Sequence, residues 1–321
     1  MPAVLRLTAV LFMVACACAS DRASRGEQMI EQAKAVNDIR GLPSFEMKAT
    51  VRLDNHGRPI DGTYSLLWNG ADQWREEINL PGYSEIQVAR KEVVSVKRTT
   101  DFTPWQINLL HSLLAYGQNL SLKENERVQG IRDRRIDGRE ASCVEIAGVQ
   151  PTPRRVCVDP SSGALVRGLP FVDENPTALG AKLFPFSLKY VKREKTLAEV
   201  AVTQLTAAMQ FPASAFEPPA GAVSMPNCNP GNVRSGQLID RVNPSYPAAD
   251  RAAHVQGTVE LYAVIGTDGA LHGLDVVSGV DQSIDHSALE AVRQWRYRPY
   301  MCNGLPVEVE TTVQVSYSLA R

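Results

Sequence analysis

The sequence predicts an α+β fold with two domains, an N-terminal antiparallel β domain with an inserted helix and a small C-terminal α+β domain. Three observations support this prediction. The chain has 321 residues, more than a single hydrophobic core usually organises. Most patterned segments alternate apolar and polar residues with period two, as half-buried strands do. A stretch rich in Pro, Gly and Asn at 222–234 interrupts the pattern and is predicted to be a linker.

Residues 1–20 have the pattern of an export signal, with one Arg, an apolar run from Leu7 to Ala15 and then small residues. The run is shorter than the ~20 residues that a bilayer-spanning helix needs. Two processing routes fit this segment. Cys16, or less well Cys18, is the lipidation candidate of a lipoprotein signal, whereas cleavage near Ala17-Cys18-Ala19 would release the protein. Met13 stands where a lipoprotein signal usually has Leu, which slightly favours release.

The N-terminal domain is expected at 21–221 and opens with a helix. Met29, Ile30, Ala33 and Val36 share one face of this helix, and Gly41-Leu42-Pro43 ends it. Closely spaced strand-like runs follow, so an antiparallel meander with one buried face is predicted. The runs lie at 45–53, 63–69, 73–80, 84–90, 92–98, 134–148, 154–160, 164–169, 184–194 and 197–206.

One helix interrupts these strands. Pro104 suits its first turn, Gly117 ends it, and a broad apolar stripe runs along it. The stripe consists of Trp105, Leu109, Leu110, Leu113, Leu114 and Tyr116. The more usual role of such a stripe is to fill a solid core.

Four cysteines lie beyond the export signal, and an even number in an exported chain favours disulfides. Cys143 and Cys157 lie in strand-like runs that could face each other across a hairpin. Cys228 and Cys302 flank the C-terminal domain. We therefore predict the bonds Cys143–Cys157 and Cys228–Cys302. A zinc site would need closely spaced pairs such as Cys-x-x-Cys, which the sequence lacks, so no metal or other cofactor is expected.

The C-terminal domain, at 235–321, is predicted to run strand, strand, helix, strand. Two alternating runs flank the turn at Thr267-Asp268-Gly269 and form a hairpin. A helix follows, with Ser283 as its expected N-cap. Its apolar face consists of Ile284, Ala288, Ala291, Val292 and Trp295. The last run alternates from Val307 to Leu319, which is typical of a strand with one buried face.

From about Ser235 to Leu319, a quarter of the chain, the sequence resembles the C-terminal domain of TonB-type energy transducers. The resemblance rests on Tyr246-Pro247, Gln256-Gly257-Thr258-Val259, Asp268-Gly269, Ala288 to Pro299 and Gly304-Leu305-Pro306-Val307. It implies a periplasmic module whose last strand recruits an extended peptide of an outer-membrane transporter by edge addition. On that strand Glu310, Thr312, Gln314 and Ser316 would face the partner. The alternative is that the strand is simply part of a small core.

The sequence departs from that family in two ways. The linker at 222–234 is too short to be the long proline-rich spacer of true energy transducers. The export signal at 1–20 replaces the permanent membrane anchor that couples a transducer to its ExbB/ExbD motor. Energy transduction in the strict sense is therefore in doubt.

The region from Arg22 to Gly221 resembles the lipoprotein carriers LolA and LolB. A helix, antiparallel strands, an inserted apolar helix and further strands follow in that order. The closing segments Phe211-Pro212-Ala213 and 216–221 and the turn Asp159-Pro160-Ser161-Ser162-Gly163 are also similar. The resemblance implies an antiparallel half-barrel whose curved sheet and inner helix enclose a cavity for acyl chains. Trp105, Leu109, Leu113 and Tyr116 would then line this cavity, and the alternative is that they fill a solid core.

Composition and motifs argue against two classes of function. The formal net charge is −1 and the basic residues form no block, so a nucleic-acid partner is not expected. The five histidines have no metal-ligand spacing, and the sequence has no nucleophile elbow, phosphate loop or dinucleotide motif. We therefore expect a protein that is not an enzyme.

Two kinds of binding function remain. The first is a periplasmic adaptor, soluble or lipid-anchored, that grips an outer-membrane transporter or another envelope protein by strand addition and takes part in transport across the outer membrane. Its N-terminal domain could hold a lipid or acyl chain, which would make it a lipid or lipoprotein carrier. The second is a structural scaffold of the envelope with two solid cores.

Overall fold

The computed structural model describes residues 23–55, 57–118, 120–148, 154–168, 170–174, 176–192, 194–228 and 233–319. The predicted export signal, with Cys16 and Cys18, lies outside the described residues. The chain divides into two compact units, Met1–Gly70 with Leu110–Gln210 and Ala71–Leu109 with Phe211–Arg321. As predicted, strands predominate in both units and helices are few, so the fold is α+β.

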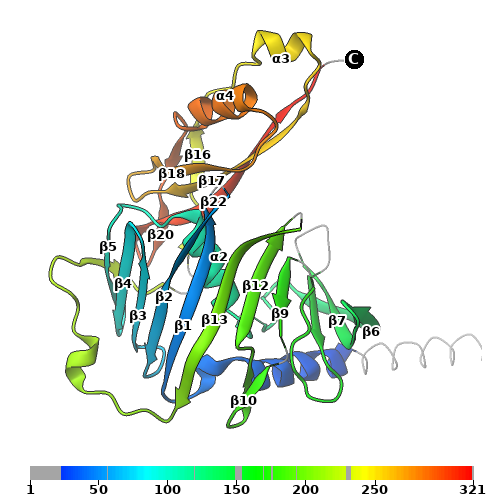
Figure 1. Ribbon diagram of the computed structural model, residues 1–321, viewed down its shortest axis with the longest axis vertical. Coiled ribbons are helices and arrows are strands. Elements are labelled where there is room, and N and C mark those ends of the chain that lie inside the picture. The colour runs from blue at the N-terminus through cyan, green and yellow to red at the C-terminus, as the bar shows by residue number, and fades with distance from the viewer. Residues whose placement is uncertain are drawn as a thin grey trace, which may run out of the picture. The chain divides into compact units, whose positions relative to one another are not determined.

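The first unit is built around long antiparallel strands. Residues 23–37 are helical and bury Ile30 and Ala33, and the short 3-10 helix η1 (Ile39–Gly41) follows. Five strands have the order β2-β1-β13-β12-β9. They are β1 (Phe45–Asn55), β2 (Arg58–Trp68), β9 (Phe171–Asp173), β12 (Ser187–Lys192) and β13 (Lys195–Ala207). Figure 1 shows β1 beside β13, with which it pairs. The predicted alternation of β1 is confirmed, because Phe45, Met47, Ala49, Val51 and Leu53 are all buried.

Two smaller sheets complete the first unit. β6 (Arg127–Ile136), β7 (Arg139–Ala147) and β8 (Arg154–Val158) form an antiparallel three-stranded sheet. β10 (Thr177–Leu179) and β11 (Lys182–Phe184) form a hairpin. Helix α2 (Trp105–Leu114) is found where the sequence predicts the inserted helix, and it buries Leu110 and Leu113.

The second unit contains four antiparallel strands in the order β14-β5-β4-β3. They are β3 (Gln73–Leu80), β4 (Tyr83–Arg90), β5 (Val93–Arg98) and β14 (Val223–Pro226). A 3-10 helix, η2 (Ala213–Phe216), precedes β14. β14 lies within the predicted linker, so this part of the linker is paired with β5 and is not irregular. Its four residues are too few for a recognisable alternation, and the edge of β5 supplies the hydrogen-bonding partners.

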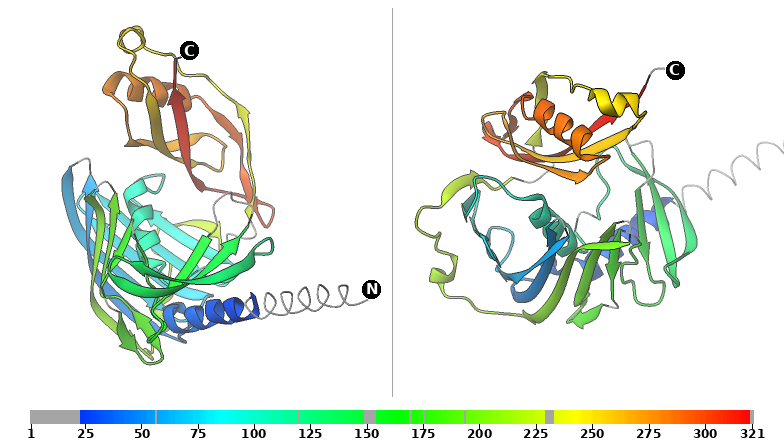
Figure 2. Two further views of the ribbon diagram at one scale, coloured as in Figure 1. Left: turned by 90° about the vertical axis from the view of Figure 1, so that its right-hand side faces the viewer. Right: turned by 45° about the horizontal axis from the view of Figure 1, so that its top comes forward.

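The rest of the second unit is the C-terminal domain. Its central sheet has the order β18-β17-β22, from β17 (Gly257–Ile265), β18 (Leu271–Ser278) and β22 (Val309–Tyr317). Helix α4 (Gln282–Val292) covers one face of it, as Figures 1 and 2 show. The smaller elements are β15 (Val233–Arg234), β16 (Gln237–Asp240), α3 (Ala248–Ala252), β19 (Arg296–Arg298), β20 (Tyr300–Cys302) and β21 (Leu305–Val307). The predicted order of strand, strand, helix, strand is confirmed.

The core of this domain lies between α4 and the sheet. The predicted helix face is buried there, together with Val313, Val315 and Tyr317 of β22. The predicted N-cap, Ser283, is wrong. Asp281 caps α4, because its carboxylate accepts the backbone N–H of Ile284 at 2.9 Å. Asp is as good an N-cap as Ser, and the choice depends on where the chain leaves its extended conformation.

Candidate functional site

Strand β22 lies at the edge of the C-terminal sheet. Among the strands that the structure describes, it pairs with β17 only, and the pairing is antiparallel from Gly257↔Tyr317 to Ile265↔Val309. We call the side of β22 that faces away from β17 its outer edge. An edge of this kind presents backbone N–H and C=O groups to a further strand.

The alternation along β22 indicates which backbone groups lie on the outer edge. Just beyond the strand, the N–H of Leu319 donates to Oε1 of Gln256, the residue before β17. Backbone groups of successive residues point to opposite sides of a strand, so Tyr317, Val315 and Val313 also point toward β17. Ser316, Gln314, Thr312 and Glu310 therefore direct their N–H and C=O groups to the outer edge.

The side chains of these four residues are exposed, as the sequence predicts. Val313, Val315 and Tyr317 between them are buried, and Tyr317 packs edge-on against Tyr246 with ring centroids 5.3 Å apart. The strand thus has one face in the core and a polar face of hydroxyl, amide and carboxylate groups. That these four residues contact a partner stays a prediction.

The face of the sheet opposite α4 is covered at one end by the segment that contains Thr103 and Asn108. This contact was not predicted from the sequence. Tyr262 and Val264 lie on that face and are nevertheless buried. The Tyr262 hydroxyl donates to the Thr103 carbonyl oxygen at 2.9 Å and accepts a hydrogen bond from the Asn108 amide. Burial raises the pKa of Tyr262, and the nearby Glu310 carboxylate raises it further, so the hydroxyl keeps its proton and can donate.

Two further contacts join the segment 98–108 to this domain. The indole Nε1 of Trp105 donates to the Asp275 carboxylate at 2.7 Å, and the Arg98 guanidinium donates to both oxygens of Glu308. The sequence does contain a signal that both faces of β17 are covered. Residues 261–265 of β17 are apolar without interruption, which is typical of a strand buried on both faces.

The four predicted cavity residues of the inserted helix have different surroundings. Leu113 and Tyr116 are buried, and Tyr116 packs edge-on against Phe184 with centroids 5.6 Å apart. Leu109 is half-buried. Trp105 lines a pocket of about 430 Å³ together with Phe102, Leu274 and other residues. Their role as walls of an acyl-chain cavity stays a prediction.

Both predicted disulfides are present. Cys143 and Cys157 are direct cross-strand neighbours on β7 and β8, with Cα atoms 3.9 Å apart. Cys228 follows β14 and is bonded to Cys302 of β20, with Cα atoms 6.3 Å apart. The second bond ties the middle of the predicted linker to the C-terminal domain.

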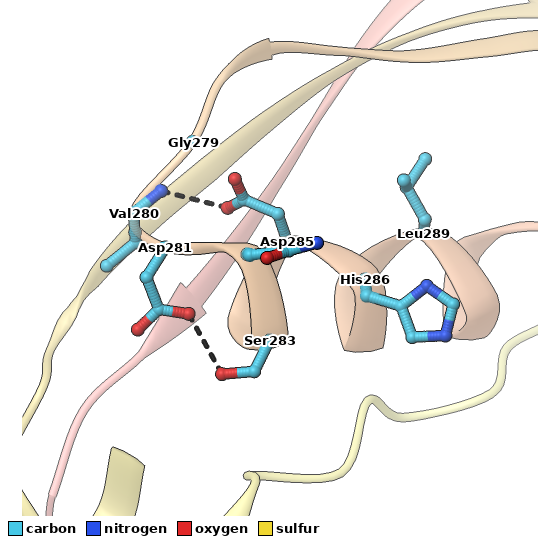
Figure 3. Close-up of a pocket in the computed structure, with 8 residues that line it drawn as sticks. Gly279, Val280, Asp281, Ser283, Asp285, His286 and Leu289 are labelled. Carbon is cyan, nitrogen blue, oxygen red and sulfur yellow. Dashed lines mark hydrogen bonds between the residues drawn. The ribbon is translucent and has the colours of Figure 1, made fainter.

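A pocket of about 970 Å³ lies at the N-terminal end of α4 (Figure 3). Its carboxylates serve the local backbone. Asp281 caps the helix, and Asp285 accepts the N–H of Val280 at 2.8 Å. Hydrogen bonding to Ile284 lowers the pKa of Asp281. These groups explain the start of the helix, and no ligand has to be invoked for them.

The part of the chain that the structure describes contains no group of three or more His, Cys, Asp or Glu residues placed to hold a metal ion. Within the same residues, none of the helices combines the length and apolar character needed to cross a bilayer.

Several solved structures are similar to this chain over about three fifths of its length. A LolA superfamily protein from Nitrosomonas europaea has a TM-score of 0.41 and 12% sequence identity, and covers 60% of this chain and 97% of its own. A DUF1329 family protein from Desulfovibrio piger has a TM-score of 0.41 and 11% identity, and covers 61% and 97%.

Sequence comparison concerns the C-terminal domain. The chain is 29% identical over 80 residues to Protein TonB of Vibrio cholerae and 33% identical over 63 residues to Protein TonB of Klebsiella pneumoniae. These matches cover 25% and 19% of this chain, and only 33% and 26% of the relatives. The chain therefore spans about a third or less of the curated relatives it matches. Residues 242–319 match the family model of the Gram-negative bacterial TonB protein C-terminal, so the chain carries a domain of this family at its C-terminal end.

Proposed function

We propose that this protein is a periplasmic adaptor of the Gram-negative envelope that binds an extended segment of an outer-membrane transporter or another envelope protein. The segment adds as a further strand to the outer edge of β22. The observation that carries the proposal is the position of β22 at the end of the sheet β18-β17-β22, where Thr312 and Gln314 have outward backbone groups and exposed side chains. The match of residues 242–319 to the TonB C-terminal family supports the choice of an envelope partner.

In binding of this kind, the backbone supplies affinity and the side chains supply selectivity. Each main-chain hydrogen bond to the added strand contributes roughly 0.5–1.5 kcal/mol net, whatever the partner's sequence. The outward side chains of Glu310, Thr312, Gln314 and Ser316 then select among partners. No step of this function needs a cofactor or a bond-making reaction, and we propose no enzymatic activity.

Proline substitution at the outer edge tests the proposal. Thr312→Pro and Gln314→Pro each remove an outward N–H, while the hydrogen bonds to β17 stay in place. Thr312→Val and Gln314→Leu are the matched controls, because they change the side chain and keep the N–H. Cross-linked capture from the protein's own envelope, followed by synthesis of the captured segment as a peptide, provides the ligand for affinity measurement.

We expect the proline variants to lose most of the affinity and the controls to keep most of it. A circular dichroism melt shows whether each variant is folded. Folded proline variants that bind the peptide at full strength would rule out strand addition at β22.

A further inference from the structure

A third pocket lies beside the start of β22. Its volume is about 750 Å³, within the range of ligand pockets in proteins. All the lining residues belong to the second compact unit, and they come from β3, β4, β5, β14, β15, β17, β20, β21, β22 and loops of the same unit. The pocket is therefore built by the strands that precede the C-terminal domain together with that domain.

One wall of the pocket consists of apolar side chains on paired strands, namely Trp74, Val94, Val96 and Met225. Trp74 pairs with Ala89, Ala89 with Val94 and Val94 with Met225, so the four residues lie side by side on one face. They form an apolar cluster together with Val96. Because these residues sit on hydrogen-bonded strands, this wall exists before any ligand binds.

Another part of the lining comes from the end of β21 and the beginning of β22. Val307, Val309 and Glu310 belong to this part, and Val264 of β17 stands beside Glu310 in the strand register. Glu308 lies between Val307 and Val309 in sequence, and the Arg98 guanidinium donates hydrogen bonds of 2.8 and 2.9 Å to its carboxylate. The Arg98 side chain is only 10% exposed, so solvent screens this ion pair little and the turn into β22 is fixed in place.

Glu310 connects this pocket to the outer edge of β22. It is both a lining residue and the first exposed residue of the strand. If a partner segment pairs with β22 from Ser316 to Glu310, the end of that segment beside Glu310 would therefore lie at the pocket. The lining combines apolar side chains with polar ones, and its Arg98 and Glu308 are paired with each other. The apolar part suits a bulky apolar side chain, and the Glu310 carboxylate suits a basic residue nearby.

We infer that the pocket receives a bulky apolar side chain of the added strand, and that a Lys or Arg of the same segment lies opposite Glu310. This inference rests on the proposed strand addition and adds a recognition motif to it. The partner is thus an extended peptide with alternating residues whose end beside Glu310 carries one large apolar and one basic side chain.

The test uses random peptides displayed on phage, selected on the full protein isolated from the envelope of expressing cells. Met225→Trp fills the pocket from the edge strand β14. Val223→Trp is the matched control, because Val223 lies on the same strand, is 63% exposed and does not line the pocket. Melting temperatures show whether the variants are folded.

We expect selection on the unaltered protein to enrich alternating peptides with a fixed large apolar position and a nearby basic residue. These peptides should bind Met225→Trp roughly ten- to a hundredfold more weakly and Val223→Trp unchanged, since a buried large side chain accounts for about that factor. Replacing the apolar position of the peptide by Ala should cost as much on the unaltered protein and almost nothing on Met225→Trp.

The other outcomes overturn the inference in distinguishable ways. Peptides that are sensitive to Gln314→Pro and bind Met225→Trp at full strength would leave strand addition standing and remove the pocket from it. Peptides that need Met225 and ignore Gln314→Pro would refute strand addition, and with it the inferred motif. Enrichment of no alternating peptide would refute both.

Discussion

Arg98 and Glu308 are joined by an ion pair across 210 residues of sequence, with Nη2 of the guanidinium 2.8 and 2.9 Å from the two carboxylate oxygens. Arg98 is the last residue of β5, and Glu308 directly precedes β22. The guanidinium also donates to the Thr103 hydroxyl at 3.2 Å. This one side chain therefore organises both the segment that covers Tyr262 and the beginning of the candidate binding strand.

Arg98→Ala is expected to lower the free energy of unfolding of the protein by roughly 1.5–3 kcal/mol, because it leaves a half-buried Glu308 carboxylate without its charged donor. The midpoint of urea denaturation measures the change. Arg52→Ala is the control, since Arg52 forms an ion pair with Asp61 in which both side chains are more than half exposed. Equal midpoints for the two variants would contradict the importance of the Arg98 contact.

Reduction of the disulfides is expected to lower stability, and unequally. The Cys143–Cys157 bond joins residues 14 apart in sequence and the Cys228–Cys302 bond joins residues 74 apart. Loss of loop-closure entropy in the unfolded chain predicts about 3 kcal/mol for the first bond and about 4.5 kcal/mol for the second. Melting temperatures of the double serine variants of each pair test this order, and a larger loss for Cys143 and Cys157 would reverse it.

Tyr262→Phe is expected to make stability less sensitive to alkaline pH. The folded protein raises the pKa of Tyr262, whereas the unfolded chain releases this proton near the ordinary pKa of about 10. Below that pH, the contribution of the protonated Tyr262 hydroxyl to the free energy of unfolding is fully present. Above it the unfolded state binds fewer protons than the folded state, so stability falls as pH rises.

Urea midpoints at about pH 8 and about pH 11 measure this difference. The phenylalanine variant is expected to be less stable at the lower pH, by roughly 1–2 kcal/mol, because the Thr103 carbonyl and the Asn108 amide lose their partner. Its further loss between the two pH values should be smaller than that of the unaltered protein. Parallel losses would show that Tyr262 does not titrate on unfolding.

Asp281→Ala is expected to lower the melting temperature more than Ser283→Ala, because Asp281 and not Ser283 accepts the Ile284 N–H. The lowered pKa of Asp281 gives the sign of the pH dependence. Its contribution is present above the unfolded-state pKa and is lost as pH falls through the folded value. The two melting temperatures should therefore converge at strongly acidic pH.

The sequence predicted what local periodicity encodes. The buried face of β1, the hairpin of β17 and β18, the face of α4 and the exposed side chains of β22 all follow from spacing within one segment. The pairing of Cys143 with Cys157 could also be predicted, because their strands lie close together in sequence.

The sequence did not predict features that depend on two distant segments. β14 is recognisable only once the edge of β5 is known to be beside it. The contacts of Arg98, Thr103 and Trp105 with the C-terminal domain join residues more than 150 positions apart. The sequence around each of these residues contains no pattern that would predict its distant partner. The pocket beside Glu310 was missed for the same reason, since its walls come from several strands.

Each of the two disulfides joins cysteines that are consecutive among the four described ones. On the proposed route to the periplasm, the chain would emerge from a membrane channel with its N-terminal part first. Cys143 and Cys157 appear together, and Cys228 and Cys302 appear later. An oxidant that pairs each thiol with the next one to arrive would produce the native connectivity directly. Biogenesis of this protein should therefore depend on a thiol oxidase and hardly at all on a disulfide isomerase.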